Sequence, residues 1–221
     1  MKKAYFHDDF NQTQAVINGT KTQFRQIVPP KALDAWNDKD DGDEYSRSVY
    51  AESYEAKMRN FLLKYATYKV GEEVAVAQCY EDAILDVGEE KWNKRHKWYN
   101  INYLCHEKGL HNKMFVRADL MPHKIEITNI RIERLQDISD ADCLAEGILK
   151  EHVRLEYDEP QDTVLYSFPN SNKLKPMPKT SLAGYFDSPR AAYAALIDKI
   201  SGKGTWERNP WTFVYNFKLV K

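Results

Sequence analysis

One segment, residues 124–135, limits the possible folds more than any other, because it is long, apolar and changes phase at its centre. Two pairs of isoleucines alternate along it but lie one residue out of phase: Ile125, Ile127, Ile130 and Ile132. Alternation with a period of two is typical of a strand with one buried face. The phase change across Thr128-Asn129 indicates a β-bulge, which bends the strand. Small barrels require bent strands, so a strongly curved sheet is expected.

Other elements are marked by alternation or by capping residues. Strands are expected at Thr22–Val28, Glu73–Tyr80 and Trp211–Leu219. The last has apolar residues at odd positions and is expected to be half-buried and antiparallel. Helices are expected at Thr13–Asn18, Ser139–Gly147 and Ser188–Gly202. In the last two, the serine serves as N-cap and the glycine ends the helix.

Two segments differ in composition from the rest and are interpreted as insertions. Residues 31–69 start with an acidic, solvated run and continue in a helical pattern that places Met58, Phe61 and Leu62 on one face. Residues 150–186 are rich in Pro, Asn and Lys, which is typical of loop with short strands. The sequence therefore predicts a single α+β domain over residues 1–221, with insertions at about 31–69 and 150–186.

Composition excludes several classes of protein. The formal charge is -1 at pH 7, so contact with nucleic acid requires a local basic patch. The three cysteines, Cys79, Cys105 and Cys143, are widely spaced, which indicates a reducing compartment rather than a disulfide framework. No apolar run approaches the roughly 18 residues that a membrane span needs. A cytoplasmic protein without a membrane partner is expected.

The sequence predicts neither a metal site nor a cofactor. Cys105, His106 and His111 come nearest to a metal cluster, but they lack the paired spacing of zinc ligands. The run Gly202-Lys203-Gly204-Thr205 resembles a phosphate-binding loop, but it follows a helix, whereas a P-loop precedes one. Gly202 is better explained as the end of that helix.

A basic and aromatic segment covers residues 91–117. It combines five aromatic residues with seven lysines or arginines and a single acid, Glu107. Cations that follow phosphates and rings that stack on bases are typical of single-strand nucleic-acid binding. The alternative is a basic loop whose rings anchor it to the core. The absence of a ribonucleoprotein signature favours this second interpretation.

Lys21, Thr22 and Arg25 lie at the predicted junction between the first helix and the strand after it. A lysine removed from water can act as a general base, and a carboxylate such as Glu146 can orient it or carry its proton. Without further evidence, charged residues at such a junction are more often solvent-exposed surface residues than a functional site.

Spaced motifs occur along nearly the whole chain, at residues 19–25, 70–76, 120–125, 130–139 and 202–211. In this order they resemble the ASCH-domain family, in particular its longer phage and bacterial branch. The resemblance implies a PUA-like β-barrel with flanking helices, and a helical insertion in this chain. It also implies RNA or modified nucleosides as the class of ligand.

In the smallest active members of that family, a lysine, a threonine three residues later and a glutamate form an amidohydrolase site that deacetylates acetylated cytidine. The resemblance carries the lysine onto Lys21 and the glutamate onto Glu146. The threonine position is occupied by Phe24. Phenylalanine is not a nucleophile, so this mechanism does not transfer unchanged.

Three functions stay open. The first is a non-catalytic module that binds RNA or a modified nucleoside or nucleotide in the barrel mouth, through Lys21, Thr22, Phe24, Arg25 and Glu146, with Phe24 stacking on a base. The second is an amidohydrolase with Lys21 as base, Glu146 as proton shuttle, and Thr22 or water as nucleophile. The third is a structural or interaction protein whose inserted helix, residues 50–65, covers Lys21.

Overall fold

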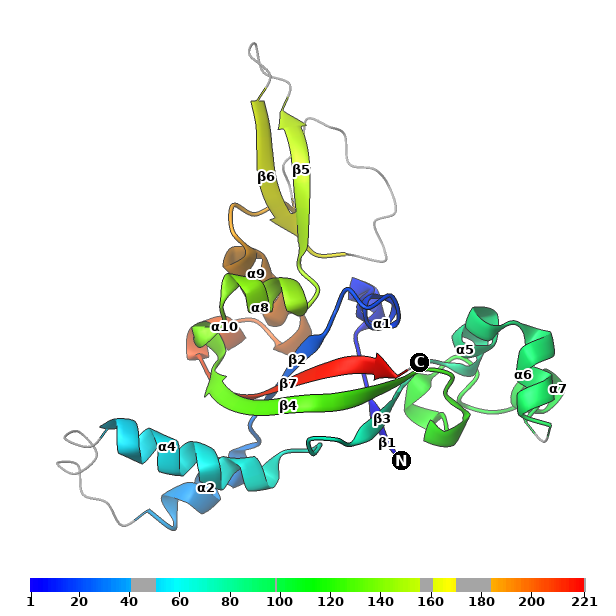
Figure 1. The fold of residues 1–221 in the computed structure, drawn as a ribbon, viewed down its shortest axis with the longest axis horizontal. Coiled ribbons are helices and arrows are strands. Elements are labelled where there is room, and N and C mark those ends of the chain that lie inside the picture. Colours follow the sequence, from blue (N-terminus) through cyan, green and yellow to red (C-terminus); the bar gives the residue numbers. More distant parts are fainter. Residues whose placement is uncertain (41–50, 98, 156–160, 170–183, 221) are drawn as a thin grey trace.

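The computed structural model describes residues 1–40, 51–97, 99–155, 161–169 and 184–220, and Figure 1 shows their arrangement. Its architecture is mixed α and β, as the sequence predicts. A five-stranded sheet contains β1 (Lys2–Ala4), β2 (Gln23–Ile27), β3 (Glu73–Val76), β4 (Lys124–Arg134) and β7 (Trp211–Val220). A separate antiparallel hairpin contains β5 (Leu149–Leu155) and β6 (Gln161–Ser167) and projects away from the sheet (Figure 1).

The strand order of the sheet is β1-β3-β4-β7-β2, and only the β1–β3 pair is parallel. The register between β4 and β7 shifts between Ile127 and Asn129, which confirms the predicted bulge. Figure 1 shows β4 as a curved ribbon. Among the described residues no ladder joins the edge strands β1 and β2, so the sheet is open rather than a closed barrel.

The C-terminal strand β7 lies inside the sheet, between β4 and β2. Thr212 and Val214 are buried together with Trp211, Phe213 and Tyr215. The expectation of a half-buried strand is therefore wrong for the first half of β7. The alternation of apolar and polar residues shows which side chains share a face of the strand. It does not show that helices cover both faces of the sheet.

The two faces of the sheet differ in chemistry. Phe24 pairs with Tyr215, and Arg25 pairs with Val214, which in turn faces Arg131 on β4. Residues directly opposite each other on paired strands point to the same face, and their sequence neighbours point to the other. We call the face with Phe24 and Tyr215 the aromatic face, and the face with Arg25 and Arg131 the polar face.

Helices lie on both sides of the sheet (Figure 1). Their bounds are α1 (Gln12–Ile17), α2 (Pro30–Asn37), α4 (Ala51–Leu62), α5 (Tyr80–Val87), α6 (Glu89–Arg95), α7 (Ile101–Leu104), α8 (Asp140–Ala145), α9 (Pro189–Ser201) and α10 (Thr205–Arg208). The N-caps predicted for α8 and α9 are confirmed, because Ser139 Oγ accepts from Asp142 N and Ser188 Oγ accepts from Ala191 N. Such caps satisfy backbone donors that the first turn leaves free.

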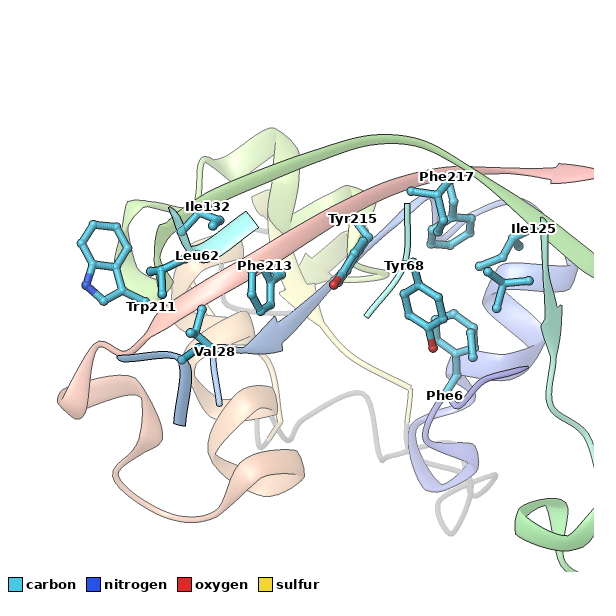
Figure 2. Packing of buried hydrophobic residues seen from close by; sticks show 14 of the residues in the cluster. Phe6, Val28, Leu62, Tyr68, Ile125, Ile132, Trp211, Phe213, Tyr215 and Phe217 are labelled. Carbon is cyan, nitrogen blue, oxygen red and sulfur yellow. The ribbon is translucent and has the colours of Figure 1, made fainter. Parts of the chain in front are cut away.

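The aromatic face carries the main hydrophobic core. Figure 2 shows the rings of Phe213, Tyr215 and Phe217 of β7 in this core, where Tyr215 packs on Tyr68 and Phe217 packs on Phe6. The helices of the first insertion belong to this core, because α2 contributes Ala32 and α4 contributes Met58 and Leu62. Half of the acidic run before α4, namely Asp41, Asp43 and Glu44, lies outside the described residues.

A helical lobe, residues 80–121, was not expected. The strand predicted for residues 73–80 ends at Val76, and Tyr80 instead begins α5, whose N-cap is Cys79. Segment 91–117, expected to be a loop, contains α6, α7 and a 3₁₀ turn at Lys113–Phe115. The lobe has its own core of Tyr80, Ala83, Ile84, Trp92, Leu104, Val116, Leu120 and Met121, together with Ala75 of β3. No helix in the described part of the chain is long and apolar enough to cross a membrane.

Candidate functional site

Lys21 and Glu146 meet on the polar face of the sheet, although 125 residues separate them. Lys21 Nζ lies 2.9 Å from Glu146 Oε2 and donates to the backbone oxygen of Glu146 at 2.7 Å. The Lys21 side chain is 1% exposed and that of Glu146 is 5% exposed. Glu146 follows the last turn of α8, and Thr22 N donates to Ala145 O at 2.9 Å, which fixes the start of β2 against that turn.

The turn after α8 depends on Gly147. Its φ of +98° is unfavourable for residues with a side chain, and the lysine carbons lie 3.8 Å from the position that a Cβ would take. This conformation ends the helix and places the carbonyl of Glu146 within reach of Lys21 Nζ. The predicted helix end therefore also positions one acceptor of the buried lysine.

Arg25 joins the same group. Its Nη1 donates to Glu146 Oε1 at 2.9 Å, its Nη2 donates to Glu133 Oε1, and Asp142 Oδ2 lies 3.5 Å from Nη2. Burial alone would lower the pKa of Arg25, but attraction to Glu146, Tyr193 and Glu133 raises it above its usual value. The Tyr193 ring of α9 lies 5.9 Å from the Arg25 guanidinium carbon. Burial and Glu146 hold the pKa of Tyr193 well above its usual value, so this phenol stays neutral.

Arg131 of β4 extends the network. Its Nη2 donates to Asp142 Oδ2 at 2.6 Å, its Nε to Glu133 Oε2 at 3.1 Å, and its Nη1 to Asn216 Oδ1 at 2.7 Å. Lys21, Arg25 and Arg131 thus face Glu133, Asp142 and Glu146, and the formal charges balance. Buried charges are tolerated when they are paired in this way. We call these six residues the buried ion network, after the buried side chains of Lys21, Arg25 and Glu146 at its centre; those of Glu133, Asp142 and Arg131 are 17%, 25% and 33% exposed.

The sequence interpretation missed Arg131, Glu133 and Asp142. A signal for the first two was present, because Arg131 and Glu133 lie two residues apart after the bulge and therefore share one face of the predicted strand. From the sequence alone, charged residues on one face of a strand indicate a solvent-exposed face, because the helices that cover this face are not known. Asp142 lies in the first turn of α8, where acidic residues are common in any helix, so its position alone does not indicate the network.

Two residues expected to bind a ligand beside Lys21 do not join the network. Phe24 points to the aromatic face, where its ring stacks on Tyr215 at 4.9 Å between centroids and contacts Phe6 and Tyr68 edge-on. The expectation that Phe24 stacks on a base in the same pocket as Lys21 is therefore wrong on this geometry. Thr22 has an exposed side chain, and only its backbone is fixed against α8.

A cavity of about 310 Å³ lies beside the buried ion network. Its lining residues come from β2, β7, α9 and the 3₁₀ turn that follows β4: Arg25, Gln26, Ile27, Leu135, Ile197, Ser201 and Thr212. The guanidinium of Arg25 is held in place by carboxylates, yet its buried Nε has no hydrogen-bond partner in the described residues. A buried donor without a partner is costly unless a ligand or water satisfies it.

The inserted helix does not cover Lys21. This lysine is closed off by the end of α8, whereas α4 packs on the aromatic face. The third of the open functions placed residues 50–65 over Lys21, and this placement is wrong.

In the described part of the chain, no group of three or more His, Cys, Asp or Glu side chains is arranged to hold a metal ion. His111 pairs instead with Glu81 at 3.0 Å. The three cysteines are free thiols that differ in exposure: Cys105 is exposed, Cys79 is intermediate and Cys143 is buried.

The thiols are expected to react at different rates. Burial raises the pKa of Cys79 to about 11 and that of Cys143 to about 12. Since the thiolate is the reactive form, a thiol reagent at about pH 8 should modify Cys105 rapidly and the other two slowly. Reaction of Cys79 should accelerate as pH rises towards its pKa. Cys105→Ser should remove the fast phase, whereas a fast phase that persists in this variant would contradict the assignment.

The structure agrees with the second interpretation of the basic and aromatic segment for some of its rings but not for all. Trp92 is buried in the lobe and its Nε1 donates to Tyr99 O at 2.8 Å, so it anchors the segment as the second interpretation predicts. Tyr103 and Phe115 are exposed. Trp98 lies outside the described residues.

Comparison with known proteins finds no match: no family model, no curated protein and no solved structure matches this chain.

Proposed function

We propose that this chain is a non-catalytic, ASCH-type module that binds RNA or a modified nucleoside, with the base in the cavity beside Arg25. The observation that carries the proposal is a cavity of about 310 Å³ with Arg25 in its wall, where three carboxylates hold the guanidinium and no group of the described residues accepts a hydrogen bond from its Nε. Small-molecule sites have volumes from roughly 300 Å³ upward, mostly apolar walls and a few oriented polar groups. Ile27, Leu135 and Ile197 supply apolar walls here.

Charge balance favours a neutral group over a phosphate in this cavity. Glu133, Asp142 and Glu146 already offset the positive charges of the network. A phosphate would add uncompensated negative charge at a buried position, which is costly. A neutral base avoids that cost.

The geometry favours binding over the amidohydrolase alternative. Both carboxylate oxygens of Glu146 are occupied, one by Lys21 and the other by Arg25. Phe24 is not a nucleophile and points to the opposite face of the sheet. Thr22, the relocated nucleophile of the alternative, has an exposed side chain rather than one in the buried network. A nucleophile and its base need to be within hydrogen-bond reach.

We also propose that the open sheet is a variant of the PUA-like barrel that the resemblance implies. The bulged, curved β4 and the helices on both sides of the sheet support this proposal. An experimental structure that contains a ladder between β1 and β2 would establish the barrel.

Titration calorimetry with cytidine and N-acetylated cytidine tests the binding site. Ser201→Trp should abolish binding, because Ser201 lines the cavity at the exposed end of α9 and an indole there would fill the space without removing any side chain of the ion network. Ser201→Ala is the matched control and should bind as the wild type does. Equal binding by wild type and Ser201→Trp would contradict the placement of the ligand.

Hydrolysis of N-acetylated cytidine distinguishes the two leading functions. No turnover is expected from the wild-type protein. Turnover that is lost in Lys21→Ala, with the fold intact by circular dichroism, would overturn the non-catalytic proposal and favour the amidohydrolase.

A further inference from the structure

A second surface, at the other edge of the sheet, gathers large apolar side chains in solvent. Tyr5, Met114 and Phe115 are 42%, 61% and 58% exposed. They are neighbours in space because Lys3 Nζ donates to Met114 O at 3.2 Å and to Val116 O at 2.7 Å, which ties the chain around β1 to the 3₁₀ turn of the lobe. Contiguous exposed apolar side chains of this kind mark interaction sites.

This surface is hollowed. A cavity of about 430 Å³ is lined by Tyr5, Phe6, His7, Asp8, Asp9, Lys113 and Met114. Lys113 pairs with Asp8 at 2.7 Å and also donates to Phe6 O, so one lysine and one carboxylate of the lining offset each other. The hollow is therefore partly apolar and has no excess of positive charge.

One lysine lies close to each of the two rings. Lys3 Nζ lies 5.4 Å from the centre of the Tyr5 ring, and Lys108 Nζ lies 5.7 Å from that of Phe115. The same lobe carries five exposed cations, none of which pairs with a carboxylate of the described residues: Lys91, Lys94, Arg95, Lys97 and Lys108. Three of them stand at i, i+3 and i+4 on α6, which places them on one face of that helix.

We infer that this surface, which we call the Tyr5–Phe115 surface, docks a single-stranded RNA. Exposed rings with adjacent, unpaired cations are the combination that binds single strands, because rings stack on bases and cations contact phosphates. Asp8 and Asp9 in the hollow repel phosphate, so the base enters the hollow and the phosphates face the lysines of the lobe. The inference rests on the proposed nucleoside site and extends it from a nucleoside to a strand.

The two sites stand at opposite edges of the sheet, since Tyr5 follows β1 and the cavity beside Arg25 adjoins β2. The sheet is curved, and Phe6 of the hollow contacts Phe24 of β2 with 5.5 Å between ring centroids, but the two cavities share no lining residue. A single nucleoside cannot reach both sites, whereas an oligonucleotide can. Affinity should therefore rise from cytidine to a dinucleotide and further to a dodecanucleotide.

The test is fluorescence anisotropy with a labelled oligocytidylate RNA dodecamer at two salt concentrations. Tyr5→Ala and Phe115→Ala should each weaken binding roughly 5- to 150-fold, the range of one lost base–ring stack. Leu85→Ala is the matched control, because Leu85 is an apolar side chain of the same lobe that is 76% exposed. It should leave the affinity unchanged. Replacing Lys91, Lys94 and Arg95 together by Gln should reduce the dependence of affinity on salt.

Two measurements distinguish the inferred RNA surface from the proposed nucleoside site. Tyr5→Ala should leave calorimetric binding of cytidine unchanged, since the cavity beside Arg25 is not altered. RNA affinity equal to wild type in both ring variants would overturn the inference, even if cytidine still binds. Binding of the wild type to anionic phospholipid vesicles, lost in the same ring variants, would also overturn it and assign the surface to a membrane.

Discussion

Glu146→Ala is expected to lower the free energy of unfolding by about 3–5 kcal/mol, the cost of removing one partner from a buried ion pair. Glu146 is the acceptor shared by Lys21 and Arg25, at 2.9 Å from each, and both cations are 1% exposed. Its loss leaves Lys21 with the backbone carbonyl as its remaining acceptor. Urea denaturation followed by circular dichroism measures the change.

A double-mutant cycle separates the cost of an unpaired charge from the net value of the pair. Lys21→Met combined with Glu146→Leu should be less destabilising than the two single changes added together, because no lysine remains buried without its carboxylate. The control is Lys218→Ala, whose pair with Glu126 at 3.0 Å is exposed and should contribute no more than about 0.5 kcal/mol. Additive single effects would contradict the direct coupling of Lys21 and Glu146.

The local elements of the fold could be predicted where short-range chemistry determines them. Ser139 and Ser188 cap their helices, and the bulge in β4 follows from the phase of four isoleucines. The helical lobe could not be predicted in this way, because its helices are short, with seven residues in α6 and four in α7. They are stabilised by the packing of Trp92 and Leu104 rather than by a long amphipathic pattern.

The candidate site was predicted in part. The resemblance to the ASCH family brought Lys21 and Glu146 together, and their contact at 2.9 Å agrees with that expectation. Arg131 and Glu133 were missed because their role depends on helix α8 covering the polar face of the sheet, which is a tertiary contact. Phe24 was misplaced for a related reason. Its position in the family motif suggested a ligand site, whereas strand alternation, read from Arg25, assigns it to the opposite face.

Phe24→Thr is the second change with a large expected effect, because it removes a ring from the aromatic core while introducing the threonine that the ASCH resemblance implies at this position. The ring packs with Phe6, Tyr68, Tyr215 and Phe217, with centroid distances of 4.9 to 5.9 Å. We expect a loss of about 3 kcal/mol in the free energy of unfolding, the low end of the range for Phe→Ala, because Phe24 is half-buried. The new hydroxyl would also need a hydrogen-bond partner among aromatic side chains.

The same variant also tests the amidohydrolase alternative, because it introduces a hydroxyl at position 24. The threonine hydroxyl would lie on the aromatic face, away from Lys21 and Glu146, so no hydrolysis of N-acetylated cytidine is expected to appear. Gln26→Thr is the control for a threonine in β2, since Gln26 is exposed, and it should change stability by no more than about 0.5 kcal/mol. Turnover gained by Phe24→Thr without loss of stability would mean that residue 24 faces Lys21, and the assignment of the two faces of β2 would have to be reversed.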